Sequence, residues 1–61
     1  MTQGFSIAQQ IEEVEREIEL RKRVYERIAA SKPREKSTLE YHMARMQAVL
    51  ATLRKLQAGG A

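Results

Sequence analysis

The chain has 61 residues, no cysteine, one histidine and a formal net charge of +3. A domain this small buries only about 60% of the surface that its unfolded chain exposes, so a lone monomer is marginally stable. Small domains compensate with disulfides, a structural metal or association. The missing cysteines exclude disulfides, and a single histidine makes a metal site improbable. Association with another chain is therefore the expected remedy.

Targeting and membrane-spanning segments in a sequence indicate the cellular location of a protein. Residues 1–10 lack the basic start and apolar run of a signal peptide. No stretch approaches the ~20 apolar residues of a membrane span. We therefore expect a cytoplasmic protein with no membrane partner. Residues 1–5 and 59–61 are predicted to be flexible, and residues 6–58 to form the single folded unit.

The first predicted helix covers about residues 6–30. Ser6 and Gln9 have the spacing of a capping box, in which the side chain of each residue accepts a hydrogen bond from the backbone N–H of the other. Apolar residues then recur in steps of four and three, which is the pattern of an amphipathic helix. Pro33 disfavours helix at Lys32 and ends this segment near Ala30. The turn is expected near residues 31–36.

The second predicted helix covers about residues 34–58. Ser37 and Glu40 form another possible capping box, and Gly59 and Gly60 supply the backbone freedom that ends helices. The short turn makes the two helices antiparallel neighbours. Their apolar seams match layer by layer, which predicts an all-α, antiparallel two-helix hairpin. The predicted hairpin core is Ile11, Val14, Ile18, Tyr25, Ile28, Leu39, Met43, Met46, Leu50 and Leu53.

Arg21 interrupts this seam opposite Met46. Its guanidinium can reach Glu17 while its stem packs. Alternatively, a polar residue in a seam fixes register or partner choice. Two other acids of the segment 12–19 have a base four residues on and are expected to pair with it, Glu12 with Arg16 and Glu19 with Arg23.

The two flanks of the seam differ in polarity. One flank is charged, which indicates contact with water; its residues are Glu12, Glu15, Glu19, Lys22, Glu26, Glu40, Gln47 and Arg54. The other flank is apolar, and such a surface usually marks a contact site. The predicted dimer interface is Leu20, Val24, His42, Val49 and Leu56. The simplest partner is a second copy, which gives a four-helix bundle.

The orientation of that dimer follows from charge. Residues 12–19 hold five acids and one base, whereas residues 21–36 hold seven bases and two acids. An antiparallel dimer sets each basic tip beside the partner's acidic segment, so we favour it over a parallel dimer. An adaptor that presents the apolar flank to a different protein is a further alternative.

The basic tip raises a second possible function. Its cations and an exposed tyrosine are suited to phosphates and unpaired bases, although cations at helix C-termini also serve the helix dipole. The candidate nucleic-acid contacts are Arg23, Arg27, Lys32, Arg34, Lys36 and Tyr41. No nucleophile is paired with a base and no glycine-rich loop precedes a helix, so we expect no enzyme activity, no cofactor and no metal.

Residues 15–25 (EREIELRKRVY) and 48–54 (AVLATLR) resemble a group of short uncharacterised helical-hairpin proteins of bacterial phage and prophage gene clusters. Members have Tyr at the end of the first helix, as Tyr25 is here, but this chain has Glu26 and Ile28 where Pro and Trp are expected. The resemblance implies a cytoplasmic bacterial setting and no known activity. The leading hypothesis is a small self-associating protein that acts through protein contacts, with nucleic-acid binding as the alternative.

Overall fold

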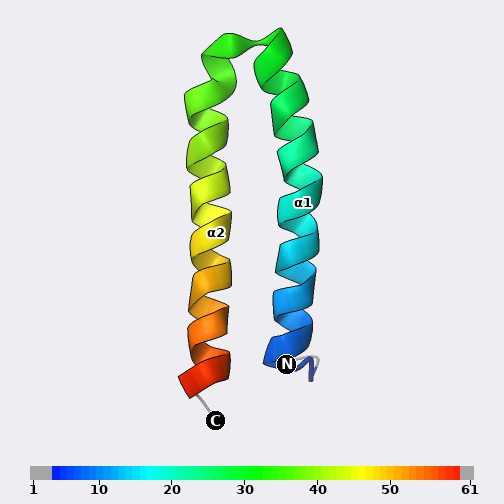
Figure 1. Cartoon of the computed structure of the whole chain (residues 1–61), viewed down its shortest axis with the longest axis vertical. Coiled ribbons are helices and arrows are strands. Elements are labelled where there is room, and N and C mark those ends of the chain that lie inside the picture. Colours follow the sequence, from blue (N-terminus) through cyan, green and yellow to red (C-terminus); the bar gives the residue numbers. More distant parts are fainter. Residues whose placement is uncertain (1–3, 60–61) are drawn as a thin grey trace.

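The computed structural model describes residues 4–59 as two long helices joined by a tight turn. Helix α1 spans Ile7–Ser31, the 3-10 helix η1 spans Pro33–Glu35, and α2 spans Lys36–Gly59. The helices lie side by side and antiparallel, with the turn at one end and both termini at the other (Figure 1). The hairpin measures 43 × 19 × 19 Å. The predicted all-α hairpin is confirmed.

The start of α1 follows from local chemistry. The Ser6 hydroxyl accepts a hydrogen bond from the Gln9 N–H at 3.1 Å, and the Gln9 side chain accepts one from the Ser6 N–H at 2.9 Å. The predicted capping box is therefore present. Just before it, the Phe5 carbonyl accepts a hydrogen bond from the Gln10 side chain at 3.2 Å. Residues 1–3 and 60–61, predicted to be flexible, lie outside the described residues, and Gly59 ends α2.

The turn differs from the prediction in one respect. Lys32 leaves the helical region, with φ −131° and ψ 79°, as expected of a residue before proline. The second capping box, however, is wrong, because Ser37 lies inside α2 rather than at its cap. The N–H groups of Glu35 and Lys36 already bond to the carbonyls of Lys32 and Pro33. The 3-10 turn therefore takes over the role that Ser37 was expected to play.

The core lies between the helices and is concentrated towards the termini. Ile11, Ile18 and Leu50 are 7–9% exposed. Five partly buried side chains pack against them, namely Ile7, Val14, Met43, Met46 and Leu53. The other predicted core residues lie nearer the turn and are half-buried, namely Tyr25, Ile28 and Leu39. The two helices therefore pack more closely near the termini than near the turn.

Candidate interaction surfaces

The apolar flank, made of the five predicted interface residues, is open to solvent. Leu20 and Val24 of α1 are 44% and 46% exposed, and Val49 and Leu56 of α2 are 49% and 52% exposed. His42 continues the row towards the turn and is also exposed. These positions share one side of the plane that contains both helices, by their heptad spacing. Neither helix of the hairpin therefore covers this flank.

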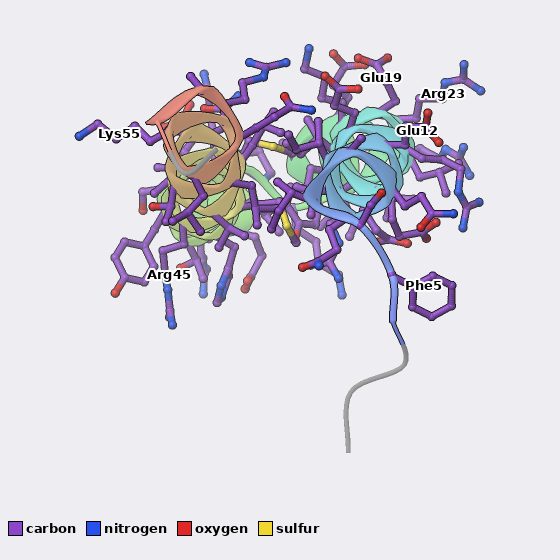
Figure 2. The ribbon with its side chains drawn as sticks, turned by 90° about the horizontal axis from the view of Figure 1, so that it is seen from below. Phe5, Glu12, Glu19, Arg23, Arg45 and Lys55 are labelled. Atoms are coloured by element: carbon purple, nitrogen blue, oxygen red, sulfur yellow. The ribbon has the colours of Figure 1, made fainter. Side chains whose placement is uncertain are left out.

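The opposite side of the hairpin is the charged flank defined above. Figure 2 looks along the helices and shows Glu12 and Glu19 on one side, with Arg45 on the other. Arg54 of α2 donates a hydrogen bond to Glu15 of α1 across this flank, at 2.6 Å between Nη2 and Oε2. This ion pair joins residues 39 positions apart in the sequence and links the two helices.

Ion pairs within α1 correct two of the predicted partners. Arg16 pairs with Glu13 at 2.7 Å instead of Glu12, and Glu19 pairs with Lys22 at 3.7 Å instead of Arg23. Spacings of three and four residues bring side chains equally close on a helix, so sequence alone did not choose between them.

Arg21 pairs with Glu17 of its own helix. Its Nε donates to Glu17 at 3.0 Å, and the side chain is 44% exposed. This bond, with the nearby Tyr25 hydroxyl adding to it, raises the pKa of Arg21 above its ordinary value. The structure therefore agrees with the reading in which the stem of Arg21 lies along the seam and its charge reaches Glu17.

The six candidate nucleic-acid contacts do not form one cluster. All six are exposed. Lys32 and Arg34 line the same hollow at the turn, whereas Arg27 lines a neighbouring hollow with Lys32. Arg23 points outward from α1 on the side of Glu19 (Figure 2). Tyr41 is carried by the other helix, so the structure does not bring Arg23 and Tyr41 together.

Tyr41 belongs to a small surface cluster that the sequence did not reveal. The ring is 60% exposed and meets the His42 ring edge to face, with 5.7 Å between centroids. The Arg45 guanidinium lies 5.5 Å from the centre of the Tyr41 ring. A four-residue spacing of Tyr and Arg on a helix was the available signal. Tyr41 is therefore held by its own helix.

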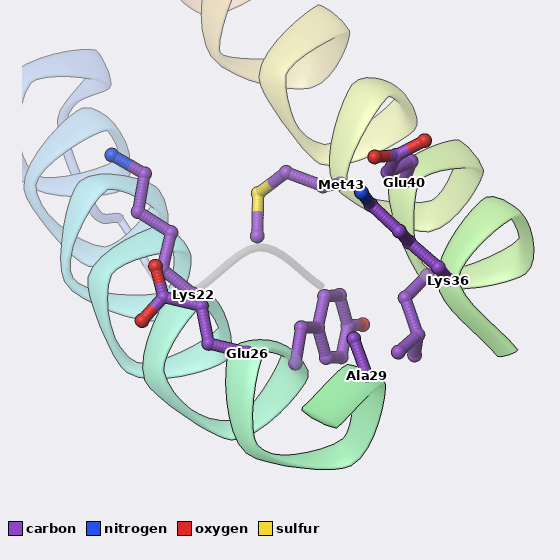
Figure 3. A pocket seen from close by; sticks show the side chains of 8 residues that line it. Lys22, Glu26, Ala29, Lys36, Glu40 and Met43 are labelled. Atoms are coloured by element: carbon purple, nitrogen blue, oxygen red, sulfur yellow. The ribbon is translucent and has the colours of Figure 1, made fainter. Parts of the chain in front are cut away.

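A hollow between the helices near the turn was also not predicted. Its volume is about 200 Å³, and Figure 3 shows Met43, Ala29 and Glu26 around it. Its eight lining residues are Lys22, Tyr25, Glu26, Ala29, Lys36, Leu39, Glu40 and Met43. Ligand pockets are usually about 300–1,000 Å³. We therefore interpret the hollow as incomplete packing beside the small Ala29 side chain.

Among residues 4–59 no three histidine, cysteine or acidic side chains converge on a point where a metal ion would fit. Neither helix there is apolar over enough of its length to cross a membrane. Comparison with protein-family models, curated proteins and solved structures yields no match. Function is therefore inferred from the surfaces themselves.

Proposed function

We propose that this chain is a self-associating helical protein that acts through protein contacts, the first of them with a second copy of itself. The observation that supports this most is the apolar flank, whose four aliphatic side chains are 44–52% exposed. Exposed apolar surface of this kind is typical of interaction sites. Covering it with a second hairpin turns a two-helix core into a four-helix bundle.

The limited core of one hairpin supports the same proposal. Only Ile11, Ile18 and Leu50 are buried among residues 4–59. Chains below about 70–80 residues rarely gain more than about 3–5 kcal/mol from a single core. A second copy would bury Leu20, Val24, Val49 and Leu56 and would supply the missing apolar burial.

The order of side chains along α1 favours an antiparallel dimer. Leu20 stands seven residues from Glu13 and seven from Arg27, all on the side of the apolar flank. A two-fold axis beside Leu20 therefore sets Glu13 against Arg27 of the second copy, twice. On α2, Val49 is likewise midway between His42 and Leu56. A parallel dimer would instead place like charges together, which is unfavourable.

The dimer is proposed to work inside a bacterial cell. The resemblance to phage and prophage hairpin proteins supports a bacterial cytoplasm as its location. A small dimer with charged ends and no catalytic pairing is suited to joining other components rather than to chemistry.

Sedimentation equilibrium at micromolar concentration tests the dimer. The wild-type chain should have twice the monomer mass, and Val49→Glu should sediment as a monomer or unfold, because it buries a charge in the interface. Gln47→Glu is the matched control, since it adds the same charge two residues away on the charged flank. A folded wild-type monomer would overturn self-association and leave the flank to a different protein.

A charge exchange tests the antiparallel order. Arg27→Glu should raise the dimer dissociation constant about tenfold or more, because it faces Glu13 of the second copy. Glu13→Arg combined with Arg27→Glu should restore most of the affinity. If both variants dimerise as the wild type does, the antiparallel register is wrong even though a dimer exists.

A further inference from the structure

The net charge of the chain is confined to its turn. We define the tip as residues 27–36, which hold four bases and one acid. The rest of the chain holds seven bases and seven acids, so its formal charge is zero. The formal net charge of +3 therefore lies within ten residues at one end of a 43 Å hairpin.

The tip bases take part in none of the ion pairs that four of the seven stem bases form. Four ion pairs form within residues 4–59, and their bases are Arg16, Arg21, Lys22 and Arg54. None of these four pairs includes a tip base. A cation without a carboxylate partner loses less when it binds an external anion, because no existing pair has to be broken. The positive charge of the tip is thus available to a ligand.

The residues of the tip indicate which class of ligand it is suited to bind. A hollow of about 360 Å³ at the turn is lined by two bases, one acid and two uncharged residues, namely Lys32, Arg34, Glu35, Ser31 and Pro33. The large apolar side chains that are exposed among residues 4–59 all lie outside the tip. Membrane-surface binders need apolar residues to insert. Protein hot spots are enriched in tryptophan and tyrosine as well as arginine, and the tip holds neither of these aromatic residues. Phosphates of a nucleic-acid backbone require only cations and hydrogen-bond donors.

We propose that the tip binds the phosphate backbone of nucleic acid through Lys32, Arg34 and Lys36. The guanidinium of Arg34 is suited to bidentate contact with a phosphate. Phosphates recur along the backbone whatever the bases are, so contacts made through phosphates alone give binding that is independent of sequence.

Arg27 is left out of this set because the dimer assigns it to Glu13 of the second copy. The rest of the inference depends on the proposed function. An antiparallel dimer carries one tip at each end, so a single dimer bridges two segments of nucleic acid. Two linked sites raise the overall affinity for nucleic acid when both can bind neighbouring segments at once, without any new contact.

Fluorescence anisotropy with duplex DNA, duplex RNA and single strands, measured from about 50 to 200 mM salt, tests the tip. With three phosphate contacts on B-DNA, the logarithm of the binding constant should fall with the logarithm of salt at a slope of about −2.7. Lys32→Ala with Arg34→Ala should weaken binding about tenfold or more and reduce the slope by about 1.8. Circular dichroism checks that the variant is folded.

The matched control removes two charges from the stem. Arg45 and Lys55 take part in none of the four ion pairs and lie outside the tip. Arg45→Ala with Lys55→Ala should leave affinity within about twofold of the wild type. Equal losses for both double variants would overturn a site at the tip, as would binding to anionic phosphatidylserine vesicles with none to nucleic acid.

Bridging is measured separately by energy transfer between two duplexes that carry different dyes. The wild-type dimer should bring them together, and Val49→Glu or dilution below the dimer dissociation constant should abolish transfer. Single-duplex binding by the diluted wild-type chain should persist, and so should that of Val49→Glu where circular dichroism shows that the variant is folded. Tip binding without transfer would overturn the bridging dimer and keep the tip site, whereas a dimer without anisotropy change would overturn the tip site and keep the dimer.

Discussion

The two halves of the hairpin differ in how closely their helices are joined. In the half near the termini, Ile11, Ile18 and Leu50 are buried and the Glu15–Arg54 pair crosses between the helices. In the half near the turn no described side chain is buried. Tyr25 there lines a hollow and is therefore incompletely packed. Stability is therefore concentrated near the termini. The half near the turn carries the formal net charge of the chain, and substitutions there disturb the fold less.

The largest expected effect comes from cutting a core side chain near the termini. Leu50→Ala should cost about 2–4 kcal/mol, because it leaves a cavity among Ile11 and Ile18. That is comparable with the whole stability of so small a core, so the variant should lose helical circular dichroism at 25 °C. The matched control is Leu39→Ala in the other half, where the half-buried side chain should cost about 1 kcal/mol. Equal losses in urea denaturation would contradict the comparison of the two halves.

Local chemistry explains why much of the fold was predictable. The Ser6 and Gln9 capping box and the break before Pro33 each depend on a few neighbouring residues. Ser37 was assigned wrongly because the hydrogen bonds of a 3-10 turn depend on how the chain turns after Pro33. Sequence patterns do not specify that geometry.

Contacts between helices were harder to predict. Glu15 and Arg54 were both placed on the charged flank, but their pairing depends on the rotation of each helix. The hollow beside Ala29 depends on the separation of the helices near the turn. The apolar flank and the basic tip were visible in the sequence because each is a property of spacing or composition. What they bind depends on partner molecules, which the pattern of one chain does not specify.

A smaller effect is expected from filling the hollow near the turn. Ala29→Leu should stabilise the chain by about 0.5–2 kcal/mol, because the larger side chain occupies space beside Tyr25 and Met43. The neighbouring Ala30 is exposed, so Ala30→Leu is the matched control and should change stability by less than about 0.5 kcal/mol. Thermal denaturation at fixed protein concentration measures both. Destabilisation by Ala29→Leu would mean that the hollow is already closed in solution.

The smallest expected effect concerns the ion pair between the helices. Arg54→Gln should cost about 0.2–1 kcal/mol, since both side chains are about half exposed and water screens the pair. A double-mutant cycle with Glu15→Gln isolates the coupling, which should shrink in 1 M salt because the screening length falls to about 3 Å. The pair of Arg16 and Glu13 is the comparison, because it lies within one helix and cannot hold the two helices together. Arg54→Gln, unlike Arg16→Gln, should therefore speed hydrogen exchange on both helices near the termini. If exchange increases only in α2, the pair does not join the helices, and the close packing of that half depends on its apolar side chains alone.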